Sequence, residues 1–142
     1  MSENTLLARS IFLVEDNPDD ERLTLRALKR GRITHPVQVA RDGEEALNML
    51  LVADPLPSVV LLDLKLPKID GLEVLQRLRA NARTRLLPVV ILTSSNEQRD
   101  IVASYSLGAN SYVRKPVDFQ QFSDAVYQLG FYWTSINEPL PD

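Results

Sequence analysis

Short runs of apolar residues alternate along the chain with longer segments in which apolar positions recur every three or four residues. The short runs are rich in β-branched residues and are bounded by turn signals, which is typical of strands buried on both faces of a parallel sheet. The clearest run, Val59 to Leu62, ends at Asp63. The predicted strands are 10–15, 37–40, 59–62, 88–93 and 111–114.

A helix-start signal follows each predicted strand. Asn17 is a capping residue and Pro18 suits the first helical position. This helix is predicted to run to Arg30, with Gly31 as the left-handed residue that ends it. The other predicted starts are Asp42, Asp70, the capping-box pattern Ser95 to Gln98, and Asp118.

Apolar residues at helical spacing mark the last two helices. Ile101, Val102 and Tyr105 form a stripe on the fourth helix, which is expected to end at Gly108. Four apolar residues of the last helix are expected to face inward: Phe119, Phe122, Val126 and Leu129.

Strand and helix therefore alternate five times, which predicts an α/β fold: a doubly wound, five-stranded parallel sheet with five helices on its two faces. Right-handed crossovers place the carboxyl end of every strand at the same edge, where such sheets bind ligands. Residues that end or follow strands should meet there. They are Glu15, Asp16, Asp63, Thr93 and Lys115.

These five residues predict a metal-assisted phosphoryl site. Three carboxylates repel one another unless a cation compensates them, and oxygen ligands without His or Cys favour Mg²⁺ or Mn²⁺. Lys115 and Thr93 add an ammonium and a hydroxyl that suit a phosphoryl group. Asp63, central on the edge, is the candidate nucleophile and would form an acyl phosphate.

Each of these residues also has an ordinary explanation. A single Asp at the end of a strand is more often a capping or turn residue, and it is the convergence with the other positions that favours a nucleophile. Asp19 and Asp20 fit the usual preference for acids at the start of a helix, and the alternative is that they enlarge the negative edge of the site. Lys115 before Pro116 could form a tight turn, and Tyr112 could be a half-exposed strand aromatic.

Composition narrows the class of protein. The chain has 142 residues, of which 44% are hydrophobic and 25% charged, which predicts one globular domain. The absence of cysteine excludes disulfides and thiolate chemistry. A net charge of −3 argues against nucleic-acid binding, and we expect a cytoplasmic protein without a signal peptide or a membrane span.

The motifs together resemble the response-regulator receiver domain of two-component signalling, from about Ser10 to Leu129. The segments that carry the resemblance are Val14 to Asp20, Leu62 to Pro67 with Asp70-Gly71, Leu92 to Ser94, and Tyr112 to Pro116. The resemblance implies a flavodoxin-like (CheY-like) fold with strand order 2-1-3-4-5.

The resemblance also implies a role for each matching residue. Asp63 would be the phosphoacceptor, and the metal would be held by Asp16 directly, by Glu15 through water, and by the backbone carbonyl of Lys65. Thr93 would be the switch hydroxyl and Tyr112 the switch aromatic. Lys115 would bind the phosphoryl group, and the peptide bond before Pro116 would be cis.

The acidic start and the aromatic tail are most similar to the small single-domain regulators that partner bacterial phytochrome histidine kinases. The implied organisation is an N-terminal lead (1–9), a receiver domain (10–129) and a C-terminal tail (130–142) that serves as a dimerisation or partner arm. Three consecutive aromatics, Phe131 to Trp133, cannot all face one side of a helix, so some should reach another surface.

The leading hypothesis is a signalling phosphoacceptor that works through protein contact and is not an enzyme beyond transferring and losing its own phosphoryl group. A Mg²⁺-dependent aspartyl-phosphate phosphohydrolase is the main alternative, but such enzymes need an acid two residues after the nucleophile, where this chain has Lys65. A receiver-like binding module that acts without phosphorylation is the other alternative. The downstream partner is not indicated by the sequence.

Overall fold

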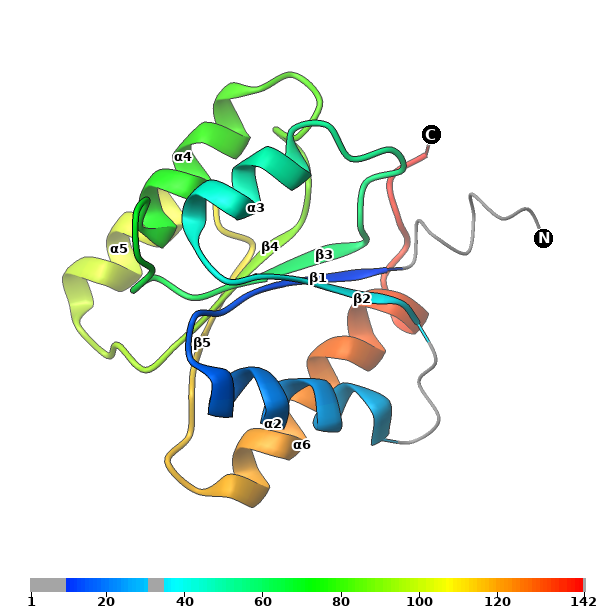
Figure 1. Ribbon diagram of the computed structural model, residues 1–142, viewed down its shortest axis with the longest axis vertical. Helices are drawn as coiled ribbons and strands as arrows, with labels where there is room; N and C mark the ends of the chain where they lie inside the picture. The colour runs from blue at the N-terminus through cyan, green and yellow to red at the C-terminus, as the bar shows by residue number, and fades with distance from the viewer. Residues whose placement is uncertain (1–9, 31–34, 142) are drawn as a thin grey trace.

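Five parallel strands form one sheet in the order β2-β1-β3-β4-β5, with helices on both faces (Figure 1). The computed structural model describes residues 10–30 and 35–141. The strands are β1 (Ile11–Val14), β2 (Val37–Ala40), β3 (Val59–Leu62), β4 (Val89–Thr93) and β5 (Ser111–Arg114). The helices are α2 (Pro18–Lys29), α3 (Gly43–Leu50), α4 (Gly71–Ala80), α5 (Gln98–Ser106), α6 (Phe119–Phe131) and the π-helix η2 (Tyr132–Ile136). The predicted fold class and strand order are confirmed.

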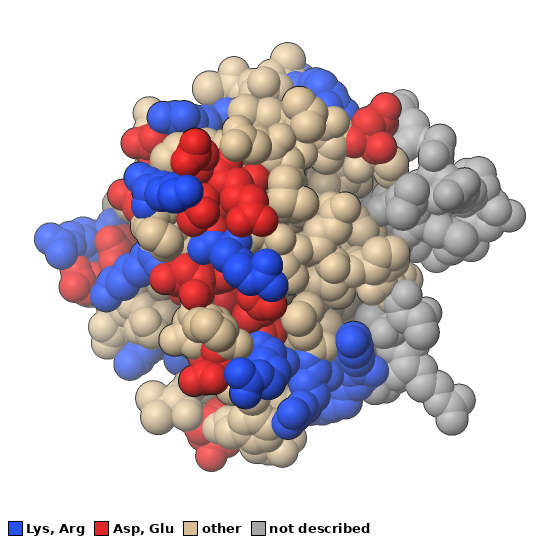
Figure 2. All heavy atoms as spheres, in the orientation of Figure 1, with Lys and Arg blue, Asp and Glu red and all other residues tan. Residues whose placement is uncertain are grey.

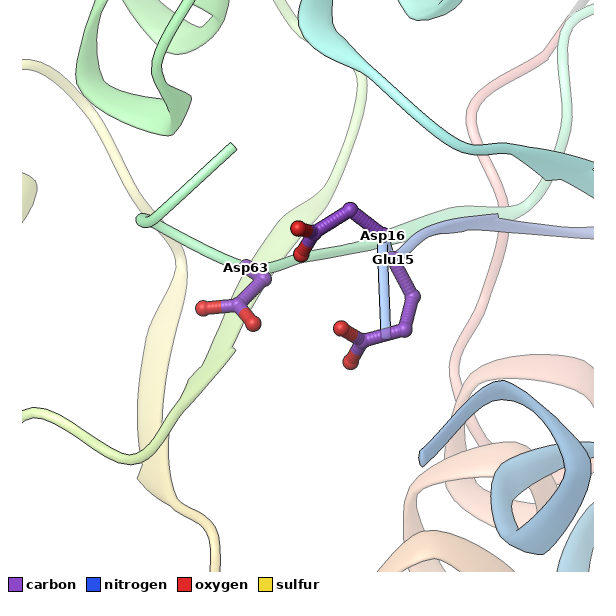
Figure 3. A group of neighbouring side chains, drawn as sticks. All are labelled: Glu15, Asp16 and Asp63. Atoms are coloured by element: carbon purple, nitrogen blue, oxygen red, sulfur yellow. The ribbon is translucent and has the colours of Figure 1, made fainter. Parts of the chain in front are cut away.

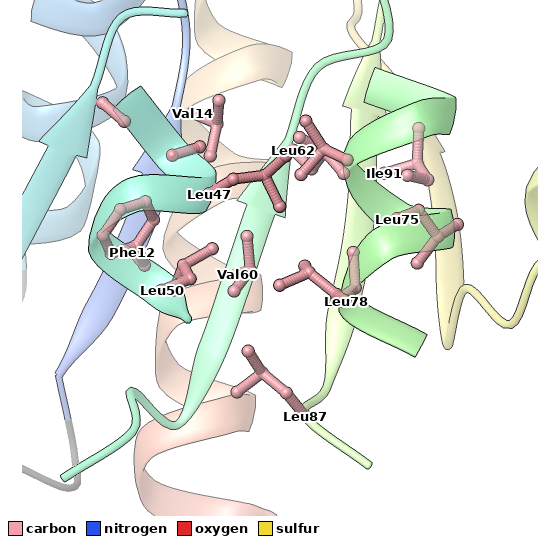
Figure 4. Close-up of a cluster of buried hydrophobic side chains, with 14 of the residues drawn as sticks. Phe12, Val14, Leu47, Leu50, Val60, Leu62, Leu75, Leu78, Leu87 and Ile91 are labelled. Carbon is pink, nitrogen blue, oxygen red and sulfur yellow. The ribbon is translucent and has the colours of Figure 1, made fainter. Parts of the chain in front are cut away.

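The central strands are buried on both faces, because their side chains alternate between two hydrophobic layers. Phe12, Val60 and Ile91 point toward α3 and α4, in the cluster that Figure 4 shows. Leu13 and Leu61 point the other way, toward α2 and α6. Each of these strands therefore needs apolar residues at successive positions, without polar residues in alternation.

Helix α2 begins at Asn17, as predicted. The Asn17 side chain accepts hydrogen bonds from the backbone N–H groups of Asp19 and Asp20, at 2.9 and 3.1 Å. Asp42, Asp70 and Asp118 cap α3, α4 and α6 in the same way. These caps fix where each helix leaves the carboxyl edge of the sheet. The predicted terminator Gly31 lies outside the described residues.

Two glycines let the loop after Asp63 pack closely against helix starts. A Cβ atom on Gly71 would lie 2.2 Å from the backbone oxygen of Asp63, and one on Gly43 would lie 1.9 Å from the backbone oxygen of Ile69. Only glycine permits approaches this close. The start of α4 is thereby held directly against the end of β3.

The predicted capping box at the start of α5 is wrong. Glu97 occupies the cap position and makes no side-chain capping bond. The Ser95 hydroxyl donates to Asp100 at 2.6 Å and accepts from the Glu97 N–H at 3.3 Å. Ser95 was predicted to be the first residue of a capping box, but it lies in the loop before the cap position and its hydroxyl ties that loop to the helix.

Two of the three residues in the apolar stripe predicted on α5 are exposed, and the third, Ile101, is half-buried. Val102 is 63% exposed and Tyr105 is 52% exposed, while the buried residue of this helix is Ser104. Helix α5 does end next to Gly108, which has a positive φ of 101°, as predicted. Val102 and Tyr105 are exposed because α5 lies at the edge of the sheet and covers β5 rather than the fully buried central strands.

Two further predictions are wrong. Phe119 of α6 is 50% exposed, because it lies in the first turn of the helix, whereas Phe122 and Val126 are buried as expected. In the described chain the cis peptide bond is Asp54–Pro55 and not the bond before Pro116. Lys115 continues the extended ladder by donating its N–H to Thr93, and a trans bond is the default for proline.

The last helix continues two residues beyond the predicted receiver boundary at residue 129 before η2 begins. Phe131 and Tyr132 are 43% and 45% exposed, while Trp133 packs against the cluster under α2 and α6. The expectation that the three aromatics face different surfaces is confirmed. The domain limits stay a prediction.

Within residues 10–30 and 35–141, no helix combines the length and apolar character needed to cross a lipid bilayer. The cytoplasmic location stays a prediction.

Candidate functional site

Three carboxylates meet at the carboxyl edge of the sheet. Glu15 and Asp16 follow β1, and Asp63 follows the neighbouring strand β3, so the side chains converge (Figure 3). One oxygen from each lies within 4.8 Å of the others. Glu15 and Asp63 are buried, whereas Asp16 is exposed. The predicted acidic site is therefore assembled by strand pairing.

Lys115 lies among these acids. Its ammonium donates to Glu15 Oε1 at 2.6 Å, to Asp20 Oδ2 at 2.9 Å and to Asp63 Oδ2 at 3.0 Å. Only 9% of the Lys115 side chain is exposed. The backbone reaches this position because Lys115 N–H bonds to Thr93 O at 2.7 Å, which extends the β4–β5 ladder by one residue.

Asp20 is a site residue whose partner sequence reasoning missed. It was interpreted chiefly as an ordinary acid at a helix start, with an enlarged negative edge as the alternative, but its carboxylate accepts a hydrogen bond from Lys115. Asp20 lies in the first turn of α2, which starts at the carboxyl edge of the sheet just after Glu15 and Asp16. An acid in the first turn of a helix that starts at this edge was the signal available in the sequence.

Burial and charge act on the site in opposite directions. Burial raises the pKa of Glu15 to about 7, against the hydrogen bond from Lys115, which favours the carboxylate. Burial alone would lower the pKa of Lys115, but the carboxylates of Glu15, Asp63 and Asp20 raise it above the usual value. The ammonium is thus firmly charged and compensates much of the negative charge around it.

Thr93 and Tyr112 lie on the other side of Asp63, in β4 and β5. Thr93 is completely buried, and its hydroxyl accepts from the Ser95 N–H at 3.4 Å. Tyr112 donates its hydroxyl to the Ser95 carbonyl at 2.9 Å. Both predicted switch residues therefore contact the same loop residue, Ser95, which sequence reasoning had assigned only to a helix cap.

The β3–α4 loop closes the remaining side of the site. The Lys65 N–H donates to Asp63 Oδ1 at 3.4 Å, and the Lys65 side chain is exposed. Lys68 in the same loop has a positive φ of 68° and contacts Asp42 and Glu44 at 3.7 and 3.6 Å. The predicted role of the Lys65 carbonyl as a metal ligand stays a prediction.

The donor set fits a hard divalent cation. Glu15, Asp16 and Asp63 supply oxygen atoms only, close enough to share one ion, and no thiolate can compete because the chain has no cysteine. Such ligands suit Mg²⁺ and Mn²⁺. The exposed carboxylate of Asp16 gives an ion access from solvent.

The distribution of charged side chains on the surface also points to the carboxyl edge of the sheet as the site. Acidic side chains gather on the left half of the face in Figure 2, where the strands of Figure 1 end and α2 begins. Beside Lys115, a depression of about 570 Å³ is lined by residues 114–118 and Gln121. This depression borders Lys115, but its lining includes none of the three carboxylates.

Comparison with known proteins agrees with this geometry. Residues 11–127 match the family model of the response regulator receiver domain. The probable methanogenesis regulatory protein FilR2 of Methanothrix harundinacea is 40% identical over 131 residues, which cover 89% of this chain and 84% of FilR2. Response regulator Rcp1 of Synechocystis is 36% identical over 138 residues, which cover 94% of each chain.

Similar solved structures are also response regulators. The phosphorylated cyanobacterial phytochrome response regulator RcpA has a TM-score of 0.88 at 36% identity, covering 94% of this chain and 99% of RcpA. The Mn²⁺-bound form of Rcp1 has a TM-score of 0.86 at 35% identity, with coverage of 94% and 99%. The bacteriophytochrome response regulator AtBRR is 53% identical with a TM-score of 0.70, with coverage of 92% and 98%.

Proposed function

The chain belongs to the family of response regulator receiver domains, and from that premise we propose that it is a single-domain response regulator whose Asp63 accepts a phosphoryl group from a sensor histidine kinase. The observation that carries the proposal is the contact between Lys115 Nζ and Asp63 Oδ2, at 3.0 Å, beside two further acids. This contact supports Asp63 as the nucleophile and Lys115 as the cation for the phosphoryl oxygens.

The transfer is a substitution at phosphorus. An oxygen of Asp63 forms a bond to phosphorus as the N–P bond of the kinase phosphohistidine breaks, and the electron pair returns to the imidazole nitrogen. Lys115 donates a hydrogen bond to a phosphoryl oxygen, and Thr93 supplies a second donor when its hydroxyl turns toward Asp63.

Glu15, Asp16 and Asp63 would hold the divalent metal, together with the backbone carbonyl of Lys65. We propose Mg²⁺ or Mn²⁺, with Asp16 a direct ligand and Glu15 acting through water. When bound, the ion supplies positive charge that offsets the charge of the phosphoryl group. The support in this chain is the set of three convergent carboxylates.

The output of the switch would pass through Ser95. Movement of Thr93 toward a phosphoryl group on Asp63 breaks its contact with the Ser95 N–H, and Tyr112, bonded to the Ser95 carbonyl, then changes position. The surface formed by α5, β5 and α6 would change with it. This surface exposes Val102, which suits it for protein contact.

Slow loss of the phosphoryl group to water is part of the proposal, but turnover of a separate substrate is not. The position two residues after Asp63 is Lys65, which is exposed and lacks the acid that would protonate a leaving group. The phosphohydrolase alternative therefore lacks its acid at the position where such enzymes carry it. The alternative of a module that works without phosphorylation is weakened because the acids and Lys115 meet in one site.

We also propose a bacterial phytochrome as the kinase and homodimerisation through α6 and the C-terminal tail. The first proposal is supported by the similarity to RcpA and AtBRR. The second is supported by exposed apolar residues at this end of the chain: Phe131, Tyr132, Ile136 and Leu140. Stacked rings of Tyr127 and Phe131, with centroids 6.3 Å apart, extend that surface along α6.

One experiment tests the phosphoacceptor. The chain and its Asp63→Asn variant are incubated with Mg²⁺ and acetyl phosphate, and intact mass is followed. We expect one phosphate on the wild-type chain and none on the variant. Steady phosphate release over many turnovers would favour the hydrolase, and the absence of any adduct on the wild-type chain would refute the proposal.

A further inference from the structure

The ammonium of Lys115 has no hydrogen left to give. A lysine ammonium carries three N–H donors. In this structure the three contacts are with Glu15, Asp20 and Asp63. If Lys115 is to donate to a phosphoryl oxygen, one of these contacts has to break first.

The three partners differ in how well they tolerate the loss. Glu15 is only 1% exposed, so water cannot replace the lysine there, and an unpaired buried carboxylate is costly. Asp63 is 11% exposed and is the group that receives the phosphoryl group. Asp20 is 33% exposed, on the first turn of α2, so solvent can hydrate its carboxylate when the lysine leaves.

On the basis of the proposed function, we propose that Asp20 is a positioning residue: it holds the third N–H of Lys115 in the unphosphorylated protein and releases it to the incoming phosphoryl group. The Asp20–Lys115 contact then exists in one state only. An interaction made in only one of two states stabilises that state. Asp20 therefore opposes phosphorylation and sets the rate at which Asp63 is modified.

The negative charge of Asp20 also opposes the phosphorylation of Asp63. A phosphodonor brings negative charge to an edge that already carries Glu15, Asp16 and Asp63. A fourth carboxylate in contact with Lys115 adds repulsion and draws on the same positive charge. Loss of that carboxylate should help an anionic donor to react.

The test compares Asp20→Asn with Asp19→Asn. Both substitutions remove one negative charge from the first turn of α2, but Asp19 is 81% exposed and contacts Arg22 rather than Lys115. Phosphorylation by acetyl phosphate is followed at saturating Mg²⁺ by intact mass. In this reaction the bond from Asp63 to phosphorus forms as the phosphorus–oxygen bond to acetate breaks, and acetate leaves with the electron pair.

We expect phosphorylation of Asp20→Asn to be about 3- to 10-fold faster than that of the wild-type chain, and Asp19→Asn to change the rate less than 2-fold. Asp20→Glu, which keeps the carboxylate, should bring the rate back toward the wild-type value. Loss of the phosphoryl group after removal of donor should change less than 2-fold, because the Asp20 contact is already broken in the phosphorylated state. A residue with only a structural role would not produce this split.

The outcomes separate the two proposals. If the wild-type chain takes up no phosphate, the proposed function and this inference both fail. If the wild-type chain is phosphorylated but Asp20→Asn behaves like Asp19→Asn, only the inference fails. Slower phosphorylation of Asp20→Asn would also overturn it, since Asp20 would then assist the transfer.

Discussion

The strands on the two sides of the sheet edge differ sharply in how deeply they are buried. On one side, β1 and β3 are completely buried and carry the acids, with Lys115 bonded across them. On the other side, β5 is only half buried, and the one buried residue of α5 is Ser104. The carboxylates proposed to receive the phosphoryl group and hold the metal lie among fully buried strands, and the surface proposed to move lies where fewer apolar side chains are buried.

The loop at Ser95 connects the two sides. Thr93 ends a buried strand next to Asp63, whereas Tyr112 belongs to the half-buried edge strand, and both bond to Ser95. A small change on the buried side can therefore reach the half-buried side through one residue. The comparison suggests experiments in which matched substitutions on the two sides give unequal effects.

The largest effect is expected from the loss of Lys115, which follows β5 but bonds to the acids after β1 and β3. Lys115→Met should slow phosphorylation of Asp63 by acetyl phosphate about 100-fold, because the cation that binds the phosphoryl oxygens during the transfer is lost. Rates are measured by intact mass at saturating Mg²⁺. Lys68→Met, at an exposed lysine of the β3–α4 loop, should change the rate less than 3-fold. Equal rates for both variants would contradict the assignment of Lys115.

Two valines test the difference in packing. Val60→Ala in β3 removes a side chain with no exposed surface and should lower the free energy of unfolding by about 2–3 kcal/mol. Val102→Ala in α5, where the side chain is 63% exposed, should change it by less than about 0.5 kcal/mol. Urea unfolding monitored by circular dichroism gives both values. Similar losses at the two positions would show that α5 is packed in solution as firmly as the central sheet.

Arg79 of α4 anchors the C-terminal end of α5. Its guanidinium donates to the carbonyls of Gly108 and Leu87, each at 2.8 Å. Arg79→Met should cost about 1.5–3 kcal/mol of unfolding free energy and increase hydrogen exchange in α5. Arg77→Met removes an exposed partner of Glu73 and should cost less than about 1 kcal/mol. If exchange in α5 is the same in both variants, the anchor is not needed to hold this helix.

The smallest effect is expected at Tyr112. Tyr112→Phe removes the hydroxyl that donates to Ser95 and should lower the free energy of unfolding by about 0.5–1.5 kcal/mol. The rate of phosphorylation should stay within 3-fold of the wild-type rate, because Tyr112 does not contact Asp63. Tyr105→Phe, at an exposed tyrosine of α5, is the control. A rate change above 10-fold would mean that Tyr112 takes part in the transfer itself.

Much of the fold follows from local rules in the sequence. An apolar run such as Val59 to Leu62 is shielded from water when it forms a strand inside a parallel sheet. Side chains such as Asn17 and Asp70 accept hydrogen bonds from backbone N–H groups two or three residues later in the chain. Parallel connectivity then forces strand ends to share one edge. This is why Asp63 and Lys115 could be placed together although 52 residues separate them.

Contacts between side chains on different elements were decided only by the tertiary structure. The bond from Lys115 to Asp20 depends on the angle at which α2 leaves the sheet, which the packing of α2 against α6 sets. The exposure of Val102 depends on how much of the sheet remains for α5 to cover. Local patterns determine which elements form and in what order. Which side chains of different elements come into contact depends on the packing of the whole core, because that packing fixes how the elements are oriented.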